Sequence, residues 1–421
     1  MKRLYLCLLS AGIFLSFSFC PVCPEDSLYE EWQERNFHLV PGAKEEAAIL
    51  LLNQSYTQPW RAANDADGDA VPDALDPSPL DWREKGYDPF GVLEFLSWDH
   101  DWNSHKYDAG ALERVVALMK EAGVGMVRLD FLWQDIEPAP GEYHFEKYDR
   151  IVDVLTRNQI RILGLLGYSA SWAGPVWNGP PEKDATFVRF AKKVIARYKN
   201  RVKYWEVWNE PDSRTYWEPQ DEMKRYTRLL KKVFSAAKSA DPSCKIVLGG
   251  MTAGGYYAIK NVYRQGGKNY FDVANIHPFV DPLRDDRISK VRSIYKNVRR
   301  LMDQNGDADK KIWFTEIGAP GIRPGEPDKG WWEGTSPGEE QQADWVKEIY
   351  EEMPSWDVEK IFWAFFRDNH EHFKSAVDYF GLIRWDFSPK PAYAGYQREA
   401  QVWNKAWKNF FRTWMQQDSD S

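Results

Sequence analysis

Residues 202–211 read Val-Lys-Tyr-Trp-Glu-Val-Trp-Asn-Glu-Pro, a run of alternating β-branched and aromatic residues that ends on a carboxylate and a proline. The alternation over Val202–Trp208 predicts a strand, and Pro211 ends it because proline has no N–H for a sheet ladder. Asn209 and Glu210 are therefore expected at the carboxyl edge of this strand. In parallel α/β barrels that edge carries the chemistry, so Glu210 is a candidate catalytic acid if the chain forms such a barrel. The alternative is that Asn-Glu-Pro only opens the next helix.

The chain from Gly91 onward has the pattern of repeated βα units, because apolar strand-like runs alternate with segments of helical period. The strand-like runs are Val92–Trp98, Met126–Trp133, Ile160–Tyr168, Val202–Trp208, Lys245–Met251, Phe271–His277, Ile312–Glu316 and Glu359–Phe366. Helices between them are expected, for example, at Ala111–Ala122, Pro181–Tyr198, Asp221–Ala240, Arg287–Asp303 and Glu339–Glu352. Eight strands at this spacing predict an α/β fold, a (β/α)8 TIM barrel over residues 87–415, rather than a doubly wound sheet.

A second Glu stands in a similar setting. Residues 312–318 read Ile-Trp-Phe-Thr-Glu-Ile-Gly, an apolar run whose first charged residue is Glu316. Its order in the chain places Glu316 on the seventh strand. Carboxylates at the ends of strands four and seven of one barrel face a common cleft.

These two motifs carry a specific resemblance. Trp-Asn-Glu-Pro at 208–211, together with Thr-Glu-Ile-Gly at 315–318, resembles the retaining glycoside hydrolases of clan A over about residues 91–400. Within the clan the chain looks closest to families 39 and 5, which include β-xylosidases, β-glucosidases and endo-acting glucanases and mannanases. The resemblance implies a β-glycosidase that hydrolyses O-glycosidic bonds of oligo- or polysaccharides by double displacement. It implies Glu210 as general acid/base, Glu316 as nucleophile and no cofactor for catalysis.

The chemistry explains these residue types. Retention needs one carboxylate to attack the anomeric carbon and one carboxylic acid to protonate the departing oxygen, about 5 to 5.5 Å apart. Burial and a neighbouring anion keep the acid protonated, and an adjacent Arg keeps the nucleophile charged. Arg128, in Val-Arg-Leu-Asp at 127–130, resembles the clan's Arg that binds the nucleophile. The alternative is a structural ion pair with Asp130.

Two polar residues are further candidates for substrate binding. Asn209 resembles the residue that hydrogen-bonds the sugar 2-hydroxyl, although it could instead cap a helix. His277 is expected at the end of strand six and matches a clan position near the nucleophile, although a lone His is often a core residue. Phe279 stands where many relatives have a Tyr that orients the nucleophile, so that contact is not expected here.

Tryptophans supply candidate sugar platforms, since indole faces stack on sugar rings. Trp363 resembles the strand-eight Trp beneath the sugar, and its alternative is a place in the core. Trp172, which follows strand three, is a second candidate. Trp331 and Trp332 lie in the long Gly- and Pro-rich loop Ala319–Pro337, which is expected to form a wall of the cleft.

The N-terminus predicts export. Lys2 and Arg3 precede an apolar run that is short for a membrane span, so residues 1–19 are expected to be a signal peptide. Cleavage would give a secreted or periplasmic protein. Cys20 offers the alternative of a lipid anchor at the cell surface.

Residues 20–86 form a polar extension with an acidic run at 65–76. Its carboxylates have the spacing that folds oxygen ligands around calcium, and resemble the loops of dockerin and thrombospondin type 3 repeats. The expected ligands of this structural calcium are Asp65, Asp67, Asp69, Asp73 and Asp76. Ala70 replaces the usual Gly, and the alternative is a solvated acidic linker. Residues 416–421 are expected to be a polar tail.

Composition narrows the function classes. The net charge of −8 argues against nucleic acid or an anionic membrane as partner. The chain has no Gly-rich phosphate loop after a first strand and no His-Glu-x-x-His, so a metal in the active site is not expected. Two rival classes are a metal-dependent barrel hydrolase and a non-catalytic carbohydrate-binding barrel. The second rival does not explain why a proton donor is present, because binding alone does not need one.

Overall fold

The computed structural model describes residues 88–100, 106–252, 255–331, 334–352, 356–369 and 372–419, with side chains described as far as residue 405. The predicted signal peptide 1–19, the extension 20–86 with its calcium loop at 65–76, and Trp332 lie outside the described residues. The last helix continues to Ser419, into the segment expected as a tail.

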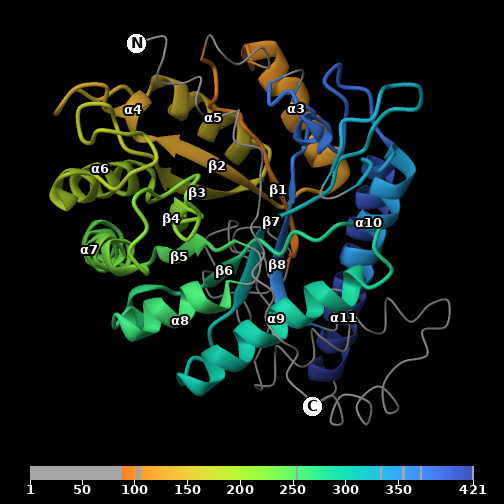
Figure 1. The fold of residues 1–421 in the computed structure, drawn as a ribbon. Helices are drawn as coiled ribbons and strands as arrows, with labels where there is room; N and C mark the ends of the chain where they lie inside the picture. Colours follow the sequence, from red (N-terminus) through yellow and green to blue (C-terminus); the bar gives the residue numbers. More distant parts are fainter. Residues whose placement is uncertain are drawn as a thin grey trace.

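Eight parallel strands form a sheet that curls into a nearly closed barrel (Figure 1). The strands are β1 (Phe90–Leu93), β2 (Met126–Leu132), β3 (Arg161–Gly167), β4 (Tyr204–Asn209), β5 (Lys245–Gly250), β6 (Ala274–Ile276), β7 (Ile312–Ile317) and β8 (Val358–Ala364). Their order is β5-β4-β3-β2-β1-β8-β7-β6, and the parallel bridges Val247–Val273 and Met251–Ile276 join the two edge strands. The prediction of eight strands in a (β/α)8 barrel is confirmed.

The first strand is shorter than predicted. It ends at Leu93 instead of Trp98, because the Trp98 N–H turns back to the Phe95 carbonyl oxygen at 3.1 Å. An apolar run with the composition of a strand therefore becomes the first loop at the carboxyl end of the barrel.

The helices surround the barrel on its outside (Figure 1). They are α3 (Ala109–Ala122), α4 (Trp133–Ile136), α5 (Glu146–Arg157), α6 (Asp184–Tyr198), α7 (Lys224–Ala240), α8 (Tyr256–Arg264), α9 (Arg287–Gln304), α10 (Glu339–Glu352) and α11 (Pro391–Ser419). In α3, the Asp108 side chain accepts from the Ala111 N–H at the start, and Gly123 ends the helix at φ 84°. None of the helices within the described ranges is long and apolar enough to span a bilayer.

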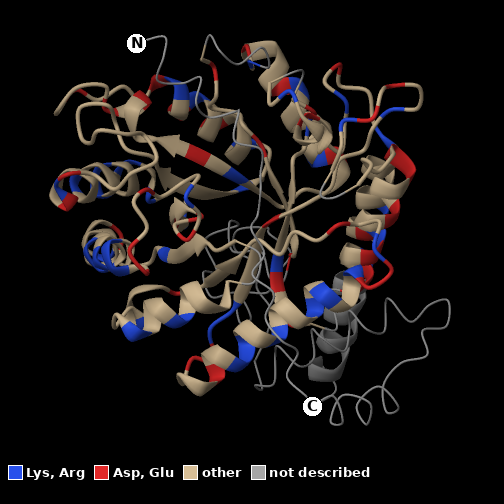
Figure 2. Ribbon diagram, in the orientation of Figure 1, with Lys and Arg blue, Asp and Glu red and all other residues tan. Residues whose placement is uncertain are grey.

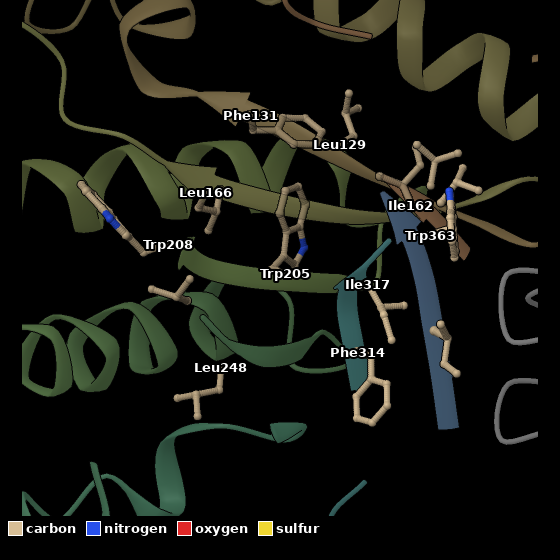
Figure 3. Packing of buried hydrophobic residues seen from close by; sticks show 14 of the residues in the cluster. Leu129, Phe131, Ile162, Leu166, Trp205, Trp208, Leu248, Phe314, Ile317 and Trp363 are labelled. Carbon is tan, nitrogen blue, oxygen red and sulfur yellow. The ribbon is translucent and has the colours of Figure 1, made fainter. Parts of the chain in front are cut away.

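The core has two layers on either side of the strands. The larger layer fills the space between strands and helices and includes Phe131, Trp205 and Leu248 (Figure 3). The smaller layer fills the barrel interior with Met126, Leu163, Val247, Val273, Trp313 and Phe362. Since side chains alternate along a strand, charged residues that follow these interior positions also face inward.

Charged residues mostly lie on the outer helices and loops, whereas β2 carries a basic and an acidic band inside the fold (Figure 2). These are Arg128 and Asp130, which are 1% and 4% exposed. A buried charged group needs polar or charged partners, so the surroundings of Arg128 and Asp130 are where a functional site is expected.

Candidate active site

Glu210 and Glu316 meet at the carboxyl ends of β4 and β7. An oxygen of Glu210, an oxygen of Glu316 and a ring nitrogen of His277 all lie within 4.8 Å of one another. The two carboxylate side chains are 14% and 15% exposed, so solvent reaches both. The structure thus brings together the two Glu residues singled out in the sequence.

Irregularities in the backbone at the ends of β4 and β7 orient the side chains of Glu210 and Glu316. Trp208 and Glu210 have positive φ angles of 69° and 41°, which interrupt the strand alternation around Asn209. In β7 the pairing register with β8 shifts between Phe314 and Ile317. As a result, neighbouring side chains at the end of each strand reach the same interior site.

Arg128 is the positive charge beside Glu316. Its Nη1 donates to Glu316 Oε1 at 2.5 Å, its Nε donates to Glu206 Oε2 at 2.7 Å, and its Nη2 donates to Asn209 Oδ1 at 2.8 Å. Arg128 makes no hydrogen bond to Asp130, whose Oδ2 accepts from Trp98 Nε1 at 2.8 Å. Arg128 therefore orients both the candidate nucleophile and Asn209.

Glu206 is a site residue that the sequence analysis missed. Its side chain is fully buried, and Oε1 accepts from Arg128 Nη2, Asn275 Nδ2 and the Gly250 N–H, each at 3.0 Å. The signal was present in the sequence, because a carboxylate two positions after an inward Tyr204 on one strand must also face inward.

His277 lies closer to Glu210 than to Glu316. Its Nδ1 is 2.9 Å from Glu210 Oε1 and 3.8 Å from Glu316 Oε1, and its Nε2 is 2.9 Å from Thr315 Oγ1. The ring is 0% exposed. Burial lowers the pKa of His277, so the imidazole is neutral. The residue expected beside the nucleophile thus hydrogen-bonds the candidate acid/base.

The two carboxylates differ in their electrostatic surroundings. Burial, with the negative charges of Asp212 and Glu206, raises the pKa of Glu210 to about 8. Burial also raises the pKa of Glu316, but the Arg128 guanidinium opposes that rise by charge and by hydrogen bond. Because only Glu316 has a cation at hydrogen-bond distance, Glu210 is the group that keeps a proton and Glu316 the group that ionises.

Three partly exposed aromatic side chains pack together near the carboxylates. The charge of Glu316 acts on both Tyr168 and Tyr216, and Trp177 contacts these two rings. Tyr168 packs against Trp177 and Tyr216, with ring centroids 5.2 and 6.0 Å apart. Burial raises the pKa of Tyr216, and the nearby charges of Glu210 and Glu316 raise it further. These residues were not predicted from the sequence, because they come from two separate loops.

The tryptophans predicted from the sequence as sugar platforms differ in their surroundings. Trp363 is 0% exposed, belongs to the core between strands and helices (Figure 3), and donates Nε1–H to the Phe380 carbonyl at 3.0 Å. This placement matches its core alternative. Trp172 is half-buried against Trp133 and donates to the Glu137 carbonyl at 2.7 Å. Trp331 packs edge-on against Phe380, with ring centroids 5.0 Å apart.

The ligand atoms of three site residues are also close enough together to bind a metal ion. Glu210, His277 and Glu316 each present one atom that could bind an ion. However, the Arg128 guanidinium already contacts Glu316 Oε1, so a positive charge occupies part of the position that a metal would need. The donor set therefore fits a proton-transfer site better than a metal centre.

Comparisons with known proteins find relatives among the glycoside hydrolases. A family model described as beta-galactosidase, of glycosyl hydrolase family 42, matches residues 101–179. A 6-phospho-beta-glucosidase of Clostridium longisporum is 32% identical over 110 residues, and the match covers 23% of this chain and 23% of the relative. A beta-1,4-xylanase of Dictyoglomus thermophilum is 29% identical over 126 residues, covering 27% of this chain and 34% of the relative.

Solved structures extend the comparison over most of the barrel. A family 39 glycoside hydrolase from the gut symbiont Bacteroides cellulosilyticus WH2 superposes with a TM-score of 0.60 and 25% identity, covering 74% of this chain and 63% of that chain. The chain is related to clan A glycoside hydrolases. The resemblance inferred from the two Glu motifs is thereby confirmed, and these clan relatives are enzymes that act on glycosides. The matched segments span only about a quarter to a third of the curated relatives' length.

Proposed function

We propose that the protein is a retaining β-glycosidase that hydrolyses O-glycosidic bonds of oligo- or polysaccharides. Glu316 is the nucleophile and Glu210 is the general acid/base. The observation that carries this proposal is the distance of at most 4.8 Å between the nearest oxygens of the two carboxylates. That spacing suits direct attack, with carboxyls about 5–5.5 Å apart, rather than the about 6.5–9.5 Å that accommodates a water in inverting enzymes.

In the first step, a Glu316 oxygen attacks the anomeric carbon and forms an ester bond as the glycosidic C–O bond breaks. The departing oxygen takes the proton of Glu210. In the second step, Glu210 accepts a proton from water, the water oxygen bonds to the anomeric carbon, and Glu316 leaves as a carboxylate. Once Glu316 is esterified its negative charge is gone, which favours the ionised form of Glu210 that this step requires.

Asn209 is the proposed partner of the sugar 2-hydroxyl. Its Oδ1 accepts from Arg128 at 2.8 Å, which fixes the amide so that Nδ2 is the end available to donate to a hydroxyl. This hydrogen bond strengthens as positive charge develops on the ring in the transition state.

The aromatic group of Tyr168, Trp177 and Tyr216 is the proposed platform for the sugar. Its rings keep exposed surface, and the charge of Glu316 acts on both tyrosines. Export through residues 1–19, with or without a lipid anchor at Cys20, is likewise a proposal. So is a structural calcium held by the aspartates of 65–76. Neither takes part in the reaction.

The test is a screen of aryl β-glycosides and polysaccharides, followed by NMR of the anomer formed first in a hydrolysed substrate. A β product from a β substrate supports double displacement, and an α product contradicts it. Activity that survives a chelator excludes the metal-dependent hydrolase. Sugar binding without turnover on any substrate favours the non-catalytic barrel.

A further inference from the structure

A chain of buried hydrogen bonds connects Glu206 to the candidate acid. Glu206 Oε1 is 3.0 Å from Asn275 Nδ2, which is 2.7 Å from Thr315 Oγ1. Thr315 Oγ1 is 2.9 Å from His277 Nε2, and His277 Nδ1 is 2.9 Å from Glu210 Oε1. Asn275, Thr315 and His277 are all 0% exposed, so water does not compete for these bonds.

The direction of each bond follows from a backbone donor. The Thr315 N–H is 3.2 Å from Asn275 Oδ1, and a backbone N–H can only donate. Asn275 Oδ1 is therefore the acceptor end of the amide. Its Nδ2 then donates one hydrogen to Glu206 and the other to Thr315 Oγ1.

The hydrogen bond of the Thr315 hydroxyl determines which nitrogen of the His277 imidazole carries the hydrogen. Having accepted from Asn275, it has one hydrogen to donate, and among the described residues its acceptor is His277 Nε2. An Nε2 that accepts carries no hydrogen, so the neutral ring has its hydrogen on Nδ1 and donates to Glu210 Oε1. The opposite tautomer would leave a buried hydroxyl hydrogen without a partner, which costs free energy.

We propose that Thr315 and Asn275 are positioning residues that hold His277 in its Nδ1–H tautomer, so that the proton transferred by Glu210 is on Oε2. This inference rests on the proposed function of Glu210. His277 occupies Oε1 as a donor and cannot take the acid's proton, because its Nδ1 lone pair is not available. The Oε2–H bond breaks as the proton passes to the departing glycosidic oxygen, and Glu210 is left ionised.

Removal of the Thr315 hydroxyl should therefore allow the proton of Glu210 to hydrogen-bond to His277 instead of remaining on Oε2. In Thr315→Val nothing holds the tautomer, so His277 Nδ1 can accept a hydrogen from protonated Glu210. That bond stabilises the protonated acid and moves the alkaline limb of kcat/KM to higher pH. The charged and titratable groups around Glu210 and His277 are unchanged by the substitution; they are Arg128, Glu206, Asp212, Tyr216 and Glu316.

Kinetics separate this role from a structural one. For a glycoside with a poor leaving group, Thr315→Val should lower kcat/KM roughly tenfold to a hundredfold, whereas a dinitrophenyl glycoside that needs little protonation should lose far less. Thr315→Ser keeps the hydroxyl and should recover most of the loss and the original alkaline limb. Equal losses for both leaving groups with an unmoved limb would overturn the proposal.

The tautomer itself can be read without any substrate. Nitrogen-15 NMR of histidine-labelled full-length protein should place the His277 hydrogen on Nδ1 in the wild type and in Thr315→Ser, and should detect a change in Thr315→Val. An Nε2–H tautomer in the wild type overturns the inference even if glycosides are hydrolysed. An Nδ1–H tautomer in a protein that hydrolyses no glycoside upholds the orientation and rejects the proposed function instead.

Discussion

Arg128 and Glu206 form a buried bidentate ion pair, with Nε to Oε2 at 2.7 Å and Nη2 to Oε1 at 3.0 Å. Two of the three guanidinium nitrogens are thus held by one carboxylate, which leaves Nη1 aimed at Glu316. Bidentate pairing fixes orientation as well as charge. The geometry of the candidate nucleophile therefore depends on a residue that the substrate does not contact.

Glu206→Gln should destabilise the fold and reduce activity together. It leaves the Arg128 charge without its main buried partner, and breaking such a pair costs about 3–5 kcal/mol in the free energy of unfolding. Denaturant unfolding measures this. Glu113→Gln is the matched control, since the Glu113–Arg157 pair is more than half exposed on both sides and should contribute far less to the free energy of unfolding. Equal effects in the two variants would contradict the assigned role of Glu206.

The pH dependence of activity should follow Glu210. Its pKa of about 8 predicts that kcat/KM falls as pH rises through that value, because the acid loses the proton it must donate. The measurement is kcat/KM of the wild type against pH, on a glycoside with a poor leaving group. A wild-type profile that is flat to well above pH 8 would contradict this assignment.

Stability should depend on pH through the same group. The folded pKa of Glu210 lies above its ordinary value of 4.5, so the unfolded chain releases this proton first as pH rises. The contribution of Glu210 to the free energy of unfolding is therefore fully present below about pH 4.5. It decreases as the pH rises from about 4.5 to about 8. Relative to Glu210→Gln, which cannot ionise, the wild type should lose stability over that interval. Denaturant midpoints at several pH values check this, and a constant difference would refute it.

Glu210→Ala should separate the two chemical steps. Glycosides with good leaving groups should still react with Glu316, since they need no proton, but the intermediate should be hydrolysed slowly. Added azide should then speed turnover, because it attacks the anomeric carbon without a general base. The product is a glycosyl azide, detectable by mass spectrometry. Absence of both rescue and azide product would argue against Glu210 as the acid/base.

Trp363 and Tyr216 should behave in opposite ways. Trp363→Ala removes a fully buried indole and should cost about 3–5 kcal/mol of stability, with KM little changed in the protein that remains folded. Tyr216→Ala, beside the carboxylates, should raise KM with a smaller loss of stability. A rise in KM for Trp363→Ala alone would restore the platform role expected from its sequence context.

Much of the barrel could be predicted from the sequence because strand periodicity and helix periodicity are local signals. All eight strands appear, as do the helices at α3, α6, α7, α9 and α10. The direction of a side chain was harder to predict in β8, where every neighbour of Trp363 is apolar and alternation does not distinguish barrel interior from helix layer. Phe362 takes the interior position and Trp363 the outer one.

The convergence of side chains could be predicted where a polar residue ends an apolar strand, as at Glu210, Glu316 and His277. The hydrogen-bond partners of inward-facing residues could not be predicted, because they depend on pairing across strands. Glu206 and Asn275 act through register between β4, β6 and β7, which a single sequence does not specify. The proposed platform at Tyr216 depends on loop conformation, which periodicity does not describe.

The most direct test of double displacement is to trap the ester on Glu316. A 2-deoxy-2-fluoro β-glycoside with a good leaving group, chosen from the sugars hydrolysed in the aryl glycoside screen, slows the second step and lets the intermediate accumulate. Mass spectrometry of the digested wild type should find the fluorosugar on the peptide that contains Glu316, and none in Glu316→Ala, which should also lack turnover. A label on another residue, or hydrolysis that persists in Glu316→Ala, would contradict the account.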